Sequence, residues 1–463
     1  MPTTEAFVGY PPRMHDISTR SLTPRTGGRR VARRLAALTV GLASLAAGLV
    51  TAQPAAAASG LTPVPYSDLK LSLNAEKDFR ALGAAVQGVE SQSGAVSKVS
   101  ALSVAQSRQH TGQASLCHNT GLDGSLKYDG FCWDKADDTS NSWSPAGGWT
   151  PQGLTGSHDA SPSGTVDGHH LYVASWYWGN GPADADRSKF GRISIAESTG
   201  TSVTYGHVML VRPTGTGASA NFTEVKNVHA DGVVWYGNKL FVANGGELQV
   251  YDMRHLWKMD SRSERTGIVN GVSSARWHDY ALPMVARYQT VPQGTNVRAC
   301  AAATGNKPCL GSLSLDRSKT PDALVSGEYR GHDAGGGGRV IRWNLNDATA
   351  LPEADGGASV GSATADAAYA SPVFQMQGVA TDGTYYYMSG ECPTGWVPDP
   401  DAPHTYSCIH RAKVGAEPHV LTKSPPLTQN LSYAPSSGRL WGLNEEINTS
   451  SGKRVVFSLD PTP

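Results

Sequence analysis

The sequence of 463 residues has little charge and no surplus of either sign. Only 17% of its residues are charged, and Lys plus Arg equal Asp plus Glu at 39 each. This composition excludes a long coiled coil and a highly charged disordered chain. The first 58 residues hold seven Arg, no Lys and two acidic residues, so the remaining chain has 32 basic and 37 acidic side chains. A chain with more acidic than basic side chains does not attract the negatively charged phosphate backbone, so we expect no nucleic acid partner.

Several common catalytic and cofactor motifs are also absent. The chain has no Gly-x-Ser-x-Gly turn placed between a strand and a helix, no dinucleotide-binding glycine fingerprint, no zincin motif and no EF-hand loop. It is instead rich in turn-forming residues, with 52 Gly and 28 Pro. Such richness favours many short strands joined by tight turns over a large helical bundle.

The N-terminal residues have the three parts of a secretory signal. A basic stretch at 29–34 is followed by an uncharged apolar stretch at 35–50 and by small residues at 56–58. We therefore predict a signal peptide over residues 1–58 and a secreted, extracellular mature protein, with an uncleaved N-terminal anchor as the alternative. No second apolar run of spanning length follows, so we expect no membrane span after signal cleavage.

Cysteine usage agrees with export to an oxidising compartment. All six cysteines follow the predicted signal and form three local couples, 15, 9 and 16 positions apart. Loop-closure entropy favours pairing between sequence neighbours. A zinc site is the alternative, but no Cys-x-x-Cys or finger-spaced His supports it. The predicted disulfides are Cys117–Cys132, Cys300–Cys309 and Cys392–Cys408.

The mature chain changes character near residue 115. Residues 59–115 carry Phe79, Leu82, Val86 and Val89 at helical spacing, which predicts a helical or linker segment. Residues 116–463 contain a degenerate repeat of two short apolar strands joined by a turn, and such recurring strand units indicate a β-propeller domain. The five copies pair 151–154 with 171–176, 229–235 with 240–245, 312–315 with 324–328, 377–380 with 386–391 and 430–433 with 440–445.

We therefore predict an all-β fold, a five-bladed β-propeller preceded by a short helical N-terminal segment. A six-bladed ring is one alternative, because residues 255–300 contain a further strand candidate between Tyr280 and Tyr288. A β-sandwich, or several small β-domains, is another arrangement that short strands with tight turns would allow.

Polar residues recur where a propeller would bring them together. The start of the first strand and the end of the second strand of each blade lie on the same face of the ring. Three blades carry a carboxylate at the same position of the repeat, which predicts an acidic site at the mouth of the ring. Glycosidases use a pair of carboxylates to cleave a glycosidic bond. The strand-one starts are Gln152, His229, Asp231, Gln377 and Asn430, and the strand-two ends are Trp176, Gly245, Glu328, Glu391 and Glu445.

Our first hypothesis is therefore a secreted glycoside hydrolase that acts on an extracellular glycan. Glu328, Glu391 and Glu445 are its candidate acid, base and nucleophile, in an order that stays open. Trp176 is a candidate stacking platform for a sugar ring. The residues expected to orient the substrate are Gln152, Asp231, Gln377 and Asn430.

Three other interpretations of the same residues stay open. The carboxylates could pair with Arg330, Arg339 or Arg342 and leave no site. The same oxygens suit Ca²⁺, and with His158 and His229 as metal ligands they suit a metal-dependent hydrolase of lactones or phosphoesters. A non-catalytic lectin-like or cell-envelope binding propeller is the third. In each case we expect a monomer that binds an extracellular glycan or a small molecule.

Three segments carry a resemblance to a group of known proteins. They are residues 149–155, with the sequence WTPQGLT, residues 229–237, with HADGVVWYG, and residues 440–445, with LWGLNE. Through them the chain, over roughly residues 115–463, resembles secreted actinobacterial β-propeller proteins of no established function. The resemblance implies a secreted propeller and implies no activity. At the level of fold alone, five-bladed propellers include glycosidases and sugar-binding lectins, which is an analogy.

Overall fold

The computed structural model describes residues 60–73, 75–142, 144–180, 190–291, 306–331, 338–393, 406–446 and 453–462. The predicted signal peptide lies outside these ranges, and the described residues all belong to the unit Ala55–Pro463. Among the described helices, none combines the length and the apolar composition that crossing a bilayer requires.

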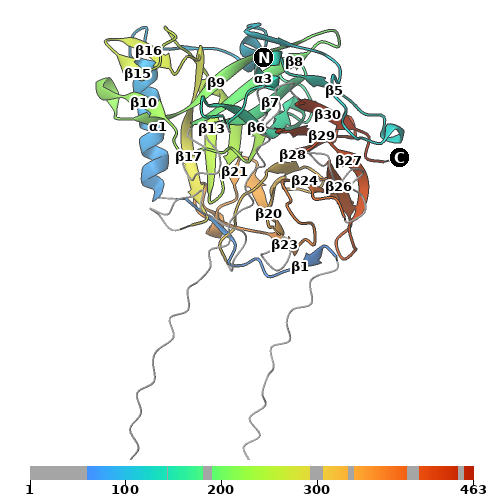
Figure 1. The fold of residues 1–463 in the computed structure, drawn as a ribbon. Coiled ribbons are helices and arrows are strands. Elements are labelled where there is room, and N and C mark those ends of the chain that lie inside the picture. The colour runs from blue at the N-terminus through green and yellow to red at the C-terminus, as the bar shows by residue number, and fades with distance from the viewer. Residues whose placement is uncertain are drawn as a thin grey trace, which may run out of the picture. The chain divides into compact units, whose positions relative to one another are not determined.

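The described residues form five antiparallel units of four strands each, which are the blades of a β-propeller (Figure 1). The strands are largely buried because each blade packs between its neighbours, and every residue of β13 is buried. In chain order the blades are β6 (Gly148–Gly156), β7 (Leu171–Gly179), β8 (Phe190–Ser198) and β9 (Val203–Thr214); β11 (Gly232–Tyr236), β12 (Lys239–Ala243), β13 (Glu247–Asp252) and β17 (Tyr280–Gln289); β18 (Ser314–Asp316), β19 (Ala323–Gly327), β20 (Arg339–Asn346) and β23 (Ala367–Ala370); β24 (Gly378–Thr381), β25 (Tyr386–Gly390), β26 (Ser407–Ala412) and β27 (His419–Ser424); and β28 (Thr428–Ala434), β29 (Arg439–Asn444), β30 (Val455–Leu459) and β5 (Asp129–Cys132).

The ring is closed by a strand from the beginning of the domain. The innermost strands β6, β11, β18, β24 and β28 contact one another in that order, and β28 contacts β6. The outermost strand of the fifth blade is β5, which pairs antiparallel with β30 and lies beside it in Figure 1. The five predicted strand pairs are the first two strands of the five blades. The expectation of a sixth blade was wrong for the described residues, because β17 is the fourth strand of the second blade.

Three glycines explain why the repeat carries glycine directly after its polar position. Gly153, Gly232 and Gly378 each lie on an innermost strand, where the backbone of the next blade comes close. A Cβ atom on Gly232 would lie 2.2 Å from the backbone N of Leu313, and one on Gly378 would lie 2.4 Å from the backbone O of Gln429. Only glycine allows this approach, so these positions set how tightly the blades converge.

The N-terminal segment packs on the outside of the blades. Helix α1 (Ala75–Ser91) contacts β17 and β9, and its apolar face includes the buried Leu82, Val86 and Val89, which confirms the predicted helix. The shorter helices are α2 (Ala101–Ala105), α3 (Lys135–Asp138) and α4 (Ser157–Ala160). Four short strands of the segment pair with other strands of the domain: β1 (Thr62–Pro63) with β23, β2 (Lys70–Leu73) with β17 and β22 (Ala363–Thr364), β3 (Ser97–Lys98) with β14 (Trp257–Lys258), and β4 (His110–Gly112) with β9.

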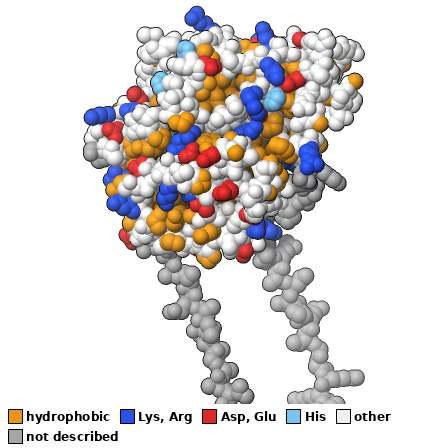
Figure 2. All heavy atoms as spheres, turned by 180° about the vertical axis from the view of Figure 1, so that it is seen from behind, with side chains coloured by type: hydrophobic (Ala, Val, Ile, Leu, Met, Phe, Trp, Pro, Cys, Tyr) orange, Lys and Arg blue, Asp and Glu red, His pale blue; other side chains and the backbone are white. Residues whose placement is uncertain are grey.

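The first two blades share further pairing at their outer edges. Strand β9 runs parallel to the first half of β17, with Tyr280 opposite Val208. The remaining short strands are β10 (Asn221–Glu224), which pairs with β9, the hairpin of β15 (Thr266–Val269) and β16 (Val272–Ala275), and β21 (Leu351–Pro352), which pairs with β20. On the face shown in Figure 2, basic and acidic side chains are interspersed.

Two of the three predicted disulfides are confirmed. Cys117 is bonded to Cys132 on β5, and Cys392 is bonded to Cys408 on β26. Cys309 is also disulfide-bonded, while Cys300, its expected partner, lies outside the described residues. The zinc alternative is therefore wrong for the two confirmed pairs, because their sulfur atoms are already bonded to each other.

Candidate functional site

A pocket of about 300 Å³ opens at the mouth of the ring, and every blade contributes to it. We call it the mouth pocket. Its polar and aromatic lining comes from strand-one starts and strand-two ends, the two positions that the repeat predicts to share a face. The lining residues that matter below are Tyr177, His229, Asp231, Tyr329, Gln377 and Glu445.

Asp231 is held at the mouth by two donors. Its Oδ1 lies 2.7 Å from Nδ1 of His229, and its Oδ2 accepts a hydrogen bond of 3.0 Å from the backbone N–H of Gly245. Hydrogen bonds to a carboxylate favour its charged form. The His229 ring stacks on Tyr177, with ring centres 4.3 Å apart, which fixes the orientation of the imidazole.

Glu445 reaches the pocket from the fifth blade, on the other side of the ring from Asp231. Nε2 of Gln152 donates to its Oε2 and also to the backbone O of Pro151. Gln152 is buried beneath the pocket, so it supports Glu445 and does not meet a ligand directly. The buried Arg454 donates to the backbone O of Glu445 over 2.6 Å and anchors the chain at this point.

The next residue, Glu446, is a buried carboxyl group that sequence reasoning missed. Burial raises its pKa from 4.5 to about 7, and the neighbouring charge of Glu445 adds to the effect. A carboxyl with such a pKa beside an acidic pocket is the kind of group that enzymes use as an acid near neutral pH. The signal was available as two consecutive Glu residues at the end of the fifth repeat.

Glu446 leads to a prediction about stability. Its pKa is higher in the folded chain, so its contribution is complete below pH 4.5 and is lost as pH rises through 7. The Glu446→Gln variant cannot ionise at this position. The change that it makes in the free energy of unfolding, relative to wild type, should therefore be about 3 kcal/mol more stabilising at pH 9 than at pH 4. Chemical denaturation at both pH values measures this difference. The exposed Glu391→Gln serves as the control, and an effect of Glu446→Gln that is equal at the two pH values would contradict the assignment.

Two of the three predicted catalytic glutamates are not at the mouth pocket. Glu328 is only 1% exposed and is held by Arg339 in a two-pronged ion pair of 2.7 and 2.8 Å. It also accepts from the backbone N–H of Cys309 and of Arg339, so both of its oxygens are engaged in holding the chain together. Glu391 is exposed and does not line the pocket. The repeat aligns these glutamates at one position. Each of them directly follows the end of its strand, where the chain no longer follows the geometry of the repeat.

Two further expectations for single residues were wrong. Trp176 is fully buried against Trp133, so it offers no surface for stacking. Its neighbour Tyr177 borders the mouth pocket, but its ring is also buried, against that of His229. Asn430 is fully buried and links two other blades, through hydrogen bonds with the backbone N–H of Leu313 and the backbone O of Leu154. Its role is to hold innermost strands together.

The predicted metal pair is not assembled. His158 follows the far end of β6 and donates to or accepts from Ser432 Oγ at 2.8 Å, in a different pocket from His229. Among the described residues, two sets bring three possible ligand atoms within 4.8 Å. One contains the disulfide-bonded Cys117 and Cys132, and the other is His110, Asp137 and His207, away from the mouth pocket.

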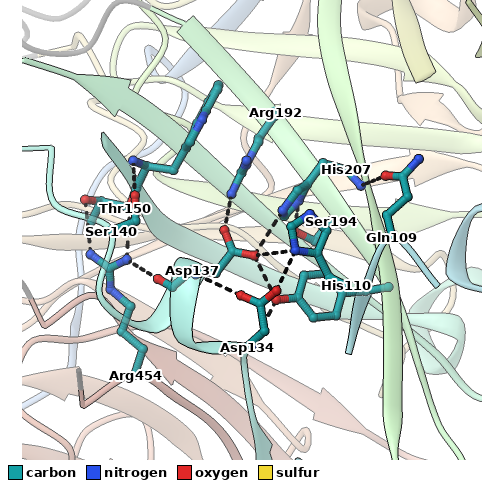
Figure 3. Close-up of polar contacts among 12 residues, drawn as sticks. Gln109, His110, Asp134, Asp137, Ser140, Thr150, Arg192, Ser194, His207 and Arg454 are labelled. Carbon is teal, nitrogen blue, oxygen red and sulfur yellow. Dashed lines mark hydrogen bonds and ion pairs between the residues drawn. The ribbon is translucent and has the colours of Figure 1, made fainter. Parts of the chain in front are cut away.

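That second set belongs to a buried cluster around Asp137 (Figure 3). Arg192 Nη2 donates to Oδ1 of Asp137 at 2.6 Å, and Oδ2 accepts from Tyr205 at 2.7 Å and lies 3.0 Å from His207 Nε2. Burial opposes the charged form of Asp137, but His207 and Arg192 outweigh it and hold its pKa well below the usual range. A guanidinium so close to the carboxylate disfavours a metal cation at the same place.

The cluster forms one wall of a second pocket, of about 380 Å³, which we call the arginine pocket. Arg192 and His207 lie in the middle of the apolar strands β8 and β9, and this was the sequence signal that could have revealed them, since charged side chains are rarely buried without a partner. The lining residues are Gln109, His110, Trp149, Trp178, Arg192, His207, Arg262, Arg276, Trp277 and His278.

No family model and no curated protein matches the chain. Solved structures resemble it only distantly. A GH43_1 enzyme from Xanthomonas citri gives a TM-score of 0.29 at 9% identity, covering 70% of this chain and 91% of that one. A gluconolactonase from Xanthomonas campestris gives 0.28 at 11%, covering 75% and 97%. Hydrazine synthase from Kuenenia stuttgartiensis gives 0.25 at 12%, covering 64% and 77%. Likenesses this weak carry no argument about activity.

Proposed function

We propose that this chain is a secreted carbohydrate-active hydrolase that cleaves a glycosidic bond in the mouth pocket. The observation that carries the proposal is that Asp231 and Glu445, from the second and fifth blades, line one cavity of about 300 Å³. Two carboxylates that flank a bound sugar are what both retaining and inverting glycosidases require. Tyr329, which is 45% exposed, adds aromatic surface to the same cavity, and Gln377 adds an amide that can bind hydroxyl groups.

The surroundings of the two carboxylates suit different roles. Asp231 lies against His229 and accepts from the Gly245 N–H, contacts that suit a carboxylate acting as base or nucleophile. Glu445 is held toward the pocket by the amide of Gln152, which donates to its Oε2, and we assign it the remaining role, that of proton donor to the leaving oxygen. Asp231, which the sequence suggested as a substrate-orienting residue, thus takes over the part first given to Glu328 and Glu391.

The lectin-like alternative predicts equivalent pockets repeated around the ring. The mouth pocket instead receives a different side chain from each blade, among them Tyr177, Asp231 and Glu445. One asymmetric site supports a single substrate held in a single orientation, as catalysis needs.

A second candidate function is hydrolysis of a lactone or ester. The specific observation in its favour is the His229–Asp231 contact of 2.7 Å, in which a carboxylate orients an imidazole, the usual general base of such hydrolases. Such a dyad can activate water without a metal ion. The reaction would release an acid and no new reducing end, so one assay separates it from glycoside hydrolysis.

The direct test is incubation of the purified chain with a panel of neutral and acidic polysaccharides and sugar lactones. We expect new reducing ends from at least one polysaccharide, detected by a reducing-sugar assay and by separation of the products. Release of acid from a lactone without reducing ends would favour the second candidate. Failure to cleave any member of the panel, together with no binding by calorimetry, would overturn the proposal.

A further inference from the structure

The arginine pocket has a wall chemistry unlike that of the mouth pocket. Three guanidinium groups line it, those of Arg192, Arg262 and Arg276, and none of the described lining residues is acidic. The nearby carboxylates are paired with lining residues: Asp137 lies 2.6 Å from Arg192, Asp134 lies 2.6 Å from His110, and Asp279 lies 3.3 Å from Arg262. These ion pairs orient two of the three cations, and each guanidinium has further N–H donors for an anion.

Arg192 is the most telling of the three. It is only 5% exposed, its guanidinium lies 4.4 Å from the centre of the Trp149 ring, and its Nε has no hydrogen-bond partner among the described residues. A buried donor without a partner is costly, and a charged one more so. A negatively charged ligand group in the pocket would offset that cost.

His278 adds a group that suits hydroxyls. Its Nδ1 lies 3.2 Å from the backbone O of Ala275 and 2.7 Å from that of Arg276, and since carbonyls only accept, Nδ1 carries the proton. Burial lowers the pKa of His278 to about 3, so the ring is neutral and its Nε2 is an acceptor. An acceptor beside three cations can take a hydroxyl hydrogen, which a sugar provides and an inorganic anion such as sulfate does not.

The rim of the pocket holds an exposed aromatic ring on strained backbone. Arg276 and Trp277 both have left-handed φ, 44° and 65°, and Trp277 is 59% exposed. The backbone is kept there by hydrogen bonds from Arg276 N to Arg265 O and from Trp277 N to Ser263 O. Such strain costs about 1–3 kcal/mol per residue and persists where the arrangement serves a purpose. Here it presents an indole face beside an arginine.

We propose that the arginine pocket binds a sugar ring that carries an anionic group, a carboxylate or a sulfate ester. The arginines bind the anion, Nε2 of His278 accepts a ring hydroxyl, and Trp277 stacks on the ring. The successive β7 residues Tyr177 and Trp178 line the mouth pocket and the arginine pocket, respectively. This inference extends the proposed function, on which it rests for the substrate class, from glycans in general to acidic glycans.

Binding measurements on four oligosaccharides test the inference: a uronate oligomer, its carboxyl-reduced neutral form, a sulfated oligomer and the desulfated form. We expect the protein to bind at least one anionic oligomer 10-fold or more tightly than its neutral counterpart, and the preferred one identifies the anion. Arg276→Gln should remove this preference, whereas Arg265→Gln, on the same hairpin but outside the pocket, should keep it.

Trp277→Gly removes the ring at a position whose φ suits glycine, so the fold should survive while binding of the anionic oligomer weakens at least 5-fold. Glu445→Gln should retain the anionic preference even if it abolishes cleavage, which separates this inference from the proposed function. Equal binding of anionic and neutral oligomers, equal losses in Arg276→Gln and Arg265→Gln, or inorganic sulfate that binds as tightly as the oligomers, would each overturn the inference.

Discussion

Glu445→Gln and Asp231→Asn should each lower the rate of glycan cleavage by about 10²–10⁴-fold, because each removes a proton-transferring or nucleophilic carboxylate while keeping the shape of the side chain. Both groups line the mouth pocket, and no other described acidic residue does. Glu445→Gln should act mainly on kcat, since the amide can still contact a bound sugar. Initial rates on the substrate found in the polysaccharide panel, with circular dichroism to verify folding, measure the effect.

Glu391→Gln is the matched control for this prediction. Glu391 occupies the same repeat position as Glu445, but it is exposed and outside the pocket, so its variant should cleave at the wild-type rate. Glu328→Gln is unsuitable for this purpose, because it would leave Arg339 without its buried partner and destabilise the fold. A Glu391→Gln variant as impaired as Glu445→Gln, or mouth-pocket variants with full activity, would show that the pocket has been misassigned.

Gly232→Ala should lower the free energy of unfolding by about 3 kcal/mol, the upper range for overpacking a well-packed core. The new Cβ would lie 2.2 Å from the backbone N of Leu313 and 2.7 Å from the backbone C of Ser312, and neither is the end of a flexible side chain. Two innermost strands would have to separate. Urea denaturation with the disulfides intact gives the change from the transition midpoint and slope.

Gly83→Ala provides the opposite outcome with the same chemical change. Gly83 lies inside helix α1, and a Cβ there would meet nothing within 4 Å. Alanine is the better helix former, so this variant should gain about 0.5–1 kcal/mol. If the two variants changed stability alike, the close approach of blades at Gly232 would not be a determinant of the ring.

The mouth pocket and the arginine pocket together suggest how an extended substrate could lie on this protein. The strand end that carries Tyr177 and Trp178 separates them, and Asp231 and Glu445 are on one side while Arg192 and Arg276 are on the other. A glycan long enough to reach both pockets would hold an acidic unit among the arginines while another part of it lay against the carboxylates. Remote binding of this kind can orient the reacting unit and thereby raise kcat as well as affinity.

Much of the fold was predictable because its cause is local. The alternation of apolar residues and the turn glycines reveal strand pairs such as 171–176 and 240–245, and five copies imply blades that must close into a ring. The same regularity predicted that strand-one starts and strand-two ends meet, and the structure places Asp231, Gln377 and Glu445 in one pocket. The local disulfide pairs followed from loop entropy in the same way.

Only the tertiary structure shows which of the residues at equivalent positions of the repeat line the pocket. Glu328, Glu391 and Glu445 are equivalent in the repeat, yet Arg339 engages the first, the second is exposed outside the pocket and only the third lines the pocket. Side chains alternate between the two faces of a strand, so a shift of one residue in an alignment moves the predicted side chain to the opposite face. Trp176 and the next residue, Tyr177, show this. The arginine pocket could not be predicted from the repeat, because its lining includes Gln109, Arg192 and Trp277, which come from segments that are not copies of one another. The sequence by itself therefore determined the blades and their common mouth, whereas the contacts between distant segments determined the chemistry placed there.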